Sequence, residues 1–263
     1  MPEPVTEINS LLQQHFDKVV VLTVPRFTER HEKVKQSLNG ISFDFFYGTD
    51  KNELTEEFIK ANYHYCKKNS LTITQTFKPL NTGEIACSLS HRKIYQAMVD
   101  NNWSHVLIFE DDVMPDYNTL PQLQNCLNEL PADWELFYLG YLKRDKINFS
   151  GRLKILWYKV LSAFGLAKMS VQMVKNILPK NYSSHLYKAG FHDCTHAYAV
   201  SLSGAKKLLA AQTPVTYRAD NLLSALTLKN ELKAFAVKHF LFNQEVFTDL
   251  SKKSYIRENW SKV

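Results

Sequence analysis

A chain of 263 residues with 45% hydrophobic and 22% charged residues is long enough for one large or two small domains, and it is neither disordered nor fibrous. Lys and Arg number 32 against 26 Asp and Glu, and the net charge of +6 favours an anionic partner: a nucleotide, a phospholipid surface or a nucleic acid. The four cysteines form no CxxC pair, which argues against a zinc knuckle or a dithiol redox motif and favours reduced thiols.

The first residues, MPEPVTEINSLLQQHF, contain acids and lack the basic and apolar segments of a signal peptide. Apolar runs elsewhere stay far below the roughly 20 residues that span a bilayer. We therefore expect a cytoplasmic protein that is soluble or at most attached to a membrane surface.

Hydrophobic patterning predicts strands that alternate with helices. The run KVVVLTV at 18–24 is apolar and β-branched, as expected of a strand buried on both faces. Further patterns predict strands at 41–47, 104–109, 136–139, 195–201 and 234–237 and helices at 28–38, 81–102 and 204–211. This alternation predicts a single α/β domain over residues 1–263, built on a mainly parallel sheet.

One segment has an unusual composition. Residues 146–192 contain eight Lys or Arg and no acidic residue. Leu153, Trp157, Leu161 and Phe164 recur at about helical spacing. A basic amphipathic helix with a Trp is typical of a membrane interface, and a helical subdomain packed on the sheet with a solvated basic face is an equal alternative. We predict a basic helical insertion at 146–192 and leave both roles open.

Three consecutive acids, Glu110, Asp111 and Asp112, follow directly after the predicted strand at 104–109. Ligands of open α/β sheets bind beyond the carboxyl ends of strands. Adjacent carboxylates repel one another unless a cation or a hydrogen-bond donor offsets their charge. Their oxygens suit Mg²⁺ or Mn²⁺, which would also bridge the phosphates of a nucleotide. The structural alternative is an acidic turn that caps the next helix.

Six blocks of the sequence read as motifs, in this order along the chain: VVVLTVPRFTERHEKV, FDFFYGTD, TGEIACSLSHRKIYQ, HVLIFEDDV, HAYAVSLSGAKKLL and PVTYRADNLL. Over about residues 18–112 and 195–223 they resemble the motifs of glycosyltransferase family 25, the lipopolysaccharide or lipooligosaccharide sugar transferases. The combination of GEIACSLSH with VLIFEDD makes the resemblance specific. Ala86 stands where the family usually has Gly, and the segment 146–192 matches none of the motifs.

The resemblance implies a GT-A-like fold, which is a Rossmann-like mixed, mainly parallel sheet flanked by helices. It implies metal-assisted, inverting transfer of galactose or glucose from a UDP-sugar donor to the lipid-linked core oligosaccharide of a bacterial lipopolysaccharide or lipooligosaccharide. The implied cofactor is Mn²⁺ or Mg²⁺, with Mn²⁺ favoured. The implied location is the inner face of the cytoplasmic membrane, with an anionic membrane surface as a further partner and no nucleic acid.

The resemblance also implies roles for individual residues. Asp112 is the implied metal ligand, and His196 and His239 are alternatives for a further ligand. Asp220 in RADNLL is the implied base that deprotonates the acceptor hydroxyl, and His91 is grouped with it among the catalytic residues. The implied donor-binding residues are Val24, Arg26, Arg30, Asp50, Glu84, Ser90, Glu110 and Asp111.

Two other functions are alternatives. One is a metal-dependent nuclease or phosphotransferase built on the acidic cluster, although the sequence contains no GxxxxGK[ST] phosphate-binding loop. The other is a nucleic-acid-binding protein, which the basic balance suggests, although much of the basic excess lies in one segment. An inactive chain with the same fold is a further alternative.

Overall fold

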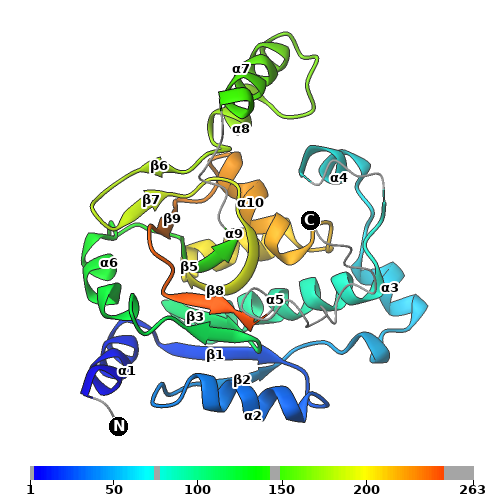
Figure 1. Ribbon diagram of the computed structural model, residues 1–263. Coiled ribbons are helices and arrows are strands. Elements are labelled where there is room, and N and C mark those ends of the chain that lie inside the picture. The colour runs from blue at the N-terminus through cyan, green and yellow to red at the C-terminus, as the bar shows by residue number, and fades with distance from the viewer. Residues whose placement is uncertain (1–2, 74–77, 143–148, 246–263) are drawn as a thin grey trace.

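The computed structural model describes residues 3–73, 78–142 and 149–245. Its centre is an eight-stranded sheet with the order β2-β1-β3-β8-β5-β9-β7-β6, and β10 and β4 form a second, two-stranded sheet (Figure 1). The strands are β1 (Lys18–Thr23), β2 (Asp44–Tyr47), β3 (His105–Glu110), β4 (Val113–Pro115), β5 (Leu136–Leu142), β6 (Lys180–Asn181), β7 (Leu186–Lys188), β8 (Asp193–Ser201), β9 (Ala234–Val237) and β10 (Phe242–Gln244).

Ten α-helices and two short 3-10 helices are seen in the described residues. The α-helices are α1 (Glu3–His15), α2 (Thr28–Ser37), α3 (Glu56–Asn62), α4 (Lys67–Ile73), α5 (Thr82–Asp100), α6 (Leu123–Glu129), α7 (Phe149–Ala163), α8 (Val171–Lys175), α9 (Leu202–Ala211) and α10 (Ala219–Leu228), and the 3-10 helices are η1 (Lys51–Glu53) and η2 (Leu120–Gln122). All six predicted strands and all three predicted helices are present, with ends shifted by up to three residues.

Strand directions make the sheet mixed. β2, β1 and β3 run parallel, β8 runs antiparallel between β3 and β5, and β9 is parallel to β5. β7 is antiparallel to β9, and β6 reverses again beside β7. Six of the eight strands therefore point the same way, which confirms the predicted α/β class with a mixed, mainly parallel sheet.

Both faces of the sheet are covered, because successive side chains of a strand point to opposite sides. On one side, the Tyr198 hydroxyl of β8 lies 2.9 Å from that of Tyr95 on α5, and α5 packs against α9 and α10. On the other side, the ring of Phe109 of β3 packs at a tilt against that of Phe242 of β10, with ring centroids 4.7 Å apart. Burial on both faces explains why β1 and β3 read as continuous apolar runs rather than as alternating patterns.

The predicted insertion is only partly helical. Residues 146–148 lie outside the described residues. From residue 149 onward the segment forms α7 and α8, but it then forms β6 and β7, which add two strands to the edge of the main sheet. Helix α7 projects from the rest of the molecule at the top of Figure 1. Among the helices that the structure describes, none combines the length and the apolar character needed to cross a membrane.

Candidate functional site

A cavity of about 730 Å³ opens at one edge of the main sheet. The carboxyl ends of the parallel strands β1 and β3 meet there with the start of the antiparallel strand β8. The first turns of α5 and α10 complete the wall. Apart from the two histidines offered as alternative further metal ligands, the residues assigned to the site from the sequence line this cavity: Val24, Arg26, Arg30, Asp50, Glu84, Ser90, His91, Glu110, Asp111, Asp112 and Asp220. Its volume is in the range of small-molecule binding sites.

Glu110 is held by groups from β8 and α5. Thr195 donates a 2.6 Å hydrogen bond from its Oγ1 to Glu110 Oε1, and His91 Nε2 lies 3.6 Å from the same oxygen. Burial acts to raise the pKa of Glu110, but His91 and Thr195 outweigh it, so that the pKa is lowered. These contacts therefore favour the ionised form of Glu110, which lines the cavity.

Asp111 turns back toward β1 and α2. Thr23 donates a 2.6 Å hydrogen bond from its Oγ1 to Asp111 Oδ2, and the guanidinium of Arg30 lies 2.8 Å from Oδ1. Burial raises the pKa of Asp111 although Arg30 opposes the rise. These contacts join three elements of the fold, so Asp111 has a structural function whatever else it does.

Asp112 is the least compensated of the three acids. Gln244 donates a 2.9 Å hydrogen bond to its Oδ2, and Arg30 lies 3.2 Å from the same atom. Its Oδ1 is buried and has no hydrogen-bond partner among the residues that the structure describes. Burial and the neighbouring charge of Glu110 raise the pKa of Asp112 to about 7. A buried carboxylate with one uncompensated oxygen is the kind of group that a cation stabilises.

The chemistry of this carboxylate fits a divalent cation with few protein ligands. Within the parts of the chain that the structure describes, no group of three or more His, Cys, Asp or Glu side chains is arranged to hold a metal ion by itself. Mg²⁺ sites commonly use one or two carboxylates and complete the coordination with substrate phosphates and water. Asp112 suits that arrangement, because the residue lines the cavity and no group of the described residues hydrogen-bonds to its Oδ1.

The two arginines of the loop and helix after β1 pair with different acids. Arg26 pairs with Asp50, which follows β2, and the same carboxylate accepts a 2.9 Å hydrogen bond from the backbone N–H of Asn52. Burial acts to raise the pKa of Asp50, but Arg26 and Asn52 reverse the effect and lower it.

Several cavity residues of α5 already have partners inside the protein. Glu84 closes a capping box with Asn81 at the start of the helix. Ser90 donates a 2.7 Å hydrogen bond to the carbonyl of Ala86 and accepts one of 2.8 Å from the N–H of Thr49. These contacts orient the helix and the loop after β2. Glu84 and Ser90 therefore have structural roles in addition to lining the cavity.

His91 belongs to a buried polar chain beneath the cavity. Its Nδ1 lies 2.7 Å from the hydroxyl of Tyr198, which in turn contacts Tyr95. The side chain of His91 is 2% exposed, so a direct contact with substrate would have to come through Nε2, the ring nitrogen with no hydrogen-bond partner within the described part of the chain. Through that nitrogen His91 faces Glu110.

Asp220 lies in the first turn of α10, and its side chain is half-buried. Its Oδ1 accepts a 2.7 Å hydrogen bond from the N–H of Asn221, and its Oδ2 lies 3.5 Å from the N–H of Cys194. Arg218, not Asp220, is the residue at the N-cap of the helix. Asp220 thus lines the cavity from α10, whereas Arg26 and Arg30 line it from the loop after β1 and from α2.

The structure adds cavity residues that sequence reasoning missed. The added residues include Lys33, Lys51, Cys194, Thr195, Arg218, Gln244 and Glu245. Arg218 lies within the RADNLL block, so that motif was a usable signal. Gln244 had no such signal, because it reaches Asp112 only through the pairing of β10 with β4.

The histidines considered as further metal ligands lie outside the cavity lining. His196 is buried, its Nε2 lies 3.3 Å from the carbonyl of Phe242, and burial lowers its pKa to about 4. His239 is exposed between β9 and β10. Cys87 does line the cavity, but burial raises the pKa of its thiol, which agrees with an inert packing residue rather than a nucleophile.

Arg30 and Arg26 are expected to contribute differently to the stability of the fold. Replacing Arg30 with Gln leaves two largely buried carboxylates uncompensated, and we expect the free energy of unfolding to fall by about 3 kcal/mol. Replacing Arg26 with Gln breaks a pair whose arginine side chain is 44% exposed, and we expect a loss of at most about 1 kcal/mol. Urea unfolding in EDTA measures both, and equal losses would show that Arg30 is not the main compensating charge.

Comparison with known proteins identifies the family. The family model described as "Glycosyltransferase family 25 (LPS biosynthesis protein)" matches residues 16–223. The probable inactive glycosyltransferase 25 family member 3 of Bos taurus is 28% identical over 205 residues, which is 75% of this chain and 29% of that protein. Procollagen galactosyltransferase 1-B of Xenopus laevis is 26% identical over 271 residues, 94% of this chain and 39% of that protein.

The chain thus spans less than half the length of these curated relatives. Among solved structures, mouse xyloside xylosyltransferase 1 in its apo form superposes with a TM-score of 0.39 at 9% identity, over 89% of this chain and 79% of that one. The family match covers most of the cavity, from β1 to the first half of α10, and leaves out only Gln244 and Glu245 of its lining. Because the family model matches far more than half of this chain, the chain belongs to glycosyltransferase family 25.

Proposed function

We propose that this chain transfers a hexose, galactose or glucose, from a UDP-sugar to the core oligosaccharide of a bacterial lipopolysaccharide or lipooligosaccharide. The description of the family as an LPS biosynthesis protein supports the acceptor class, and the galactosyltransferase names among the relatives support the sugar. Such an acceptor is lipid-linked, so the proposed place of action is the inner face of the cytoplasmic membrane.

The observation that carries the proposal is the uncompensated oxygen of Asp112 in a cavity at the strand ends. In the proposed reaction, Asp112 would hold Mn²⁺ or Mg²⁺ beside the donor diphosphate. When bound, this cation supplies positive charge that stabilises the departing diphosphate. Arg26 and Asp50 line the part of the cavity next to β1 and β2, where we propose that the nucleoside binds.

The proposed transfer is a single displacement with inversion. Asp220 accepts the proton of the acceptor hydroxyl, whose oxygen forms a bond to the anomeric carbon while the bond from that carbon to the UDP oxygen breaks. The electron pair of the broken bond leaves with UDP. A carboxylate on the α10 side of the cavity suits this role, because the base must lie on the face opposite the leaving group.

Charge at the cavity argues against the nucleic-acid alternative. Eight acidic and five basic side chains line it. An extended phosphate backbone would be repelled by that excess of carboxylates, whereas a diphosphate bound through a cation uses it. A nuclease would also cleave nucleic acid at the same cluster, so a nuclease assay with Mn²⁺ is the direct counter-test.

The experiment is a donor-hydrolysis screen across UDP-sugars, with Mn²⁺, with Mg²⁺ and with EDTA. We expect hydrolysis of UDP-galactose or UDP-glucose that requires the cation, followed by faster turnover when lipooligosaccharide acceptor is added. Turnover of no UDP-sugar under any of these conditions, or cleavage of single-stranded DNA instead, would contradict the proposed function.

A further inference from the structure

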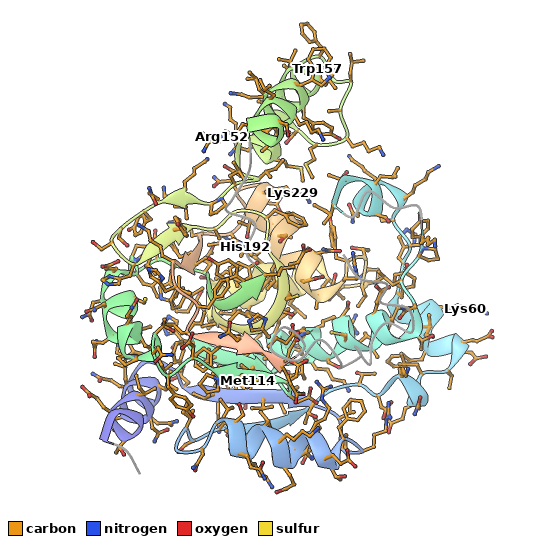
Figure 2. The ribbon with its side chains drawn as sticks, viewed as in Figure 1. Lys60, Met114, Arg152, Trp157, His192 and Lys229 are labelled. Atoms are coloured by element: carbon orange, nitrogen blue, oxygen red, sulfur yellow. The ribbon has the colours of Figure 1, made fainter. Side chains whose placement is uncertain are left out.

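Helix α7 exposes an unusually large apolar stripe. Figure 2 shows the labelled Trp157 on α7, in the part of the molecule that stands away from the body. Trp157 is 64% exposed and Phe164, just after the helix, is 76% exposed. The stripe consists of Leu153, Leu156, Trp157, Val160 and Phe164, and Leu166 extends it. Contiguous exposed apolar surface of this kind marks an interaction site in a folded protein.

The stripe faces away from the core. Its five members follow the spacing i, i+3, i+4, i+7 and i+11, which gathers them on one side of an α-helix. Ile155 and Tyr158, on the other side of α7, are partly buried and pack against the main hydrophobic core. The exposed stripe is therefore a second apolar face, distinct from the one that attaches the helix. Leu161, which the sequence pattern grouped with Leu153, Trp157 and Phe164, is half-buried beside the stripe.

Cations lie on both sides of the stripe. At about 100° per residue, Lys154 falls beyond its Trp157 edge, and Arg152 and Lys159 fall beyond its Leu156 edge. All three side chains are exposed. The sequence has no Asp or Glu between residues 149 and 192. The charge around the stripe is therefore of one sign, with long cationic side chains that can reach past an apolar surface.

We propose that this stripe docks into the interface of an anionic lipid bilayer, with Trp157 and its neighbours among the acyl chains and the flanking cations at the headgroups. The combination of an outward apolar face with flanking Lys and Arg is what such an interface recognises. A second copy of the chain would bring like charges together, and a nucleic acid would leave the apolar stripe in water.

Docking through α7 also has a consequence for the cavity. α7 packs on α8, α8 packs on α10, and the first turn of α10 carries Asp220. The bilayer thus holds the α10 side of the cavity at a defined place relative to the lipid surface. The inference stands on α7 alone and does not depend on the proposed glycosyl transfer, so vesicle binding and donor hydrolysis test the two separately.

The experiment is flotation of the full chain with vesicles of phosphatidylcholine and phosphatidylglycerol, compared with vesicles of phosphatidylcholine alone. We expect binding to the anionic vesicles that weakens as salt is added. Lys154→Gln with Lys159→Gln should weaken it by roughly 5-fold per cation. Trp157→Gln should weaken it by roughly 10- to 100-fold, because a large apolar side chain no longer enters the bilayer.

Matched controls come from exposed residues elsewhere on the molecule. Lys60→Gln with Lys206→Gln removes two exposed cations from α3 and α9, and Phe58→Gln removes a 43% exposed aromatic ring from α3. We expect these variants to bind vesicles as the unaltered chain does. Equal losses for α7 and control variants, no preference for anionic vesicles, or loss of a dimer rather than of vesicle binding in Trp157→Gln would overturn the proposal.

Discussion

Replacing Asp112 with Ala is expected to abolish sugar transfer and to weaken UDP binding in the presence of Mn²⁺. Among the described carboxylates, Asp112 is the one that has a buried oxygen without a hydrogen-bond partner in the cavity. A metal that neutralises a leaving group stabilises the transition state by several kcal/mol. At about 1.4 kcal/mol per factor of ten, the expected loss of turnover is roughly 10³-fold or more. Turnover and UDP affinity, measured with and without Mn²⁺, check this expectation.

The matched control for this variant is the neighbouring Asp111→Asn. Asp111 is bonded to Thr23 and Arg30, so we expect its loss to lower the free energy of unfolding while the effect of Mn²⁺ on UDP affinity remains. In Asp112→Ala, by contrast, we expect the effect of Mn²⁺ on UDP affinity to be lost while the free energy of unfolding is not lowered. Full turnover in Asp112→Ala would mean that the cation, if any, binds elsewhere.

Replacing Asp220 with Asn is expected to reduce transfer by about 10²- to 10⁴-fold while UDP affinity stays nearly unchanged. The amide keeps the size of the side chain and can still accept a hydrogen bond from the N–H of Asn221, but it cannot take the proton of the acceptor. UDP affinity is spared because the residues proposed to hold the nucleotide lie on the β1 and β3 side of the cavity. Initial rates with acceptor and a separate UDP titration measure the two quantities.

Asp116→Asn is a suitable control for Asp220→Asn. Asp116 likewise accepts a hydrogen bond from a nearby backbone N–H, that of Asn118, but it does not line the cavity. We expect nearly full transfer in this control. If Asp220→Asn instead loses UDP affinity along with activity, the residue belongs to the donor site and the base is another group.

Sequence patterns predicted the parts of the fold whose signals are local. β1, β3 and β9 are runs of apolar residues buried on both faces, so their positions follow from residue type alone. β4, β6, β7 and β10 are two or three residues long and depend on neighbouring strands for their conformation. No local signal distinguishes such short strands from loops.

In the candidate site, too, the features with a local sequence signal were predicted and those that depend on the assembled sheet were not. The acids at 110–112 were found because they follow a buried strand, and the catalytic, donor-binding and first metal-ligand residues assigned from the sequence do meet at one cavity, whereas His196 and His239 do not. Their pairing was not predictable, because Arg30 reaches Asp111 and Asp112 across about 80 residues of chain, and Gln244 reaches Asp112 from β10. Contacts between residues so far apart depend on the assembled sheet rather than on sequence spacing.

Calorimetric titration of UDP into the unaltered chain tests the central claim most directly, namely that the cavity beyond β1 and β3 binds a nucleoside diphosphate through a cation on Asp112. The account predicts saturable binding of one UDP in Mn²⁺, weakened by about tenfold or more when EDTA replaces the metal, and the same weakening in Asp112→Ala. UDP binding of equal strength in Mn²⁺, in EDTA and in Asp112→Ala, or no UDP binding at all, would contradict it.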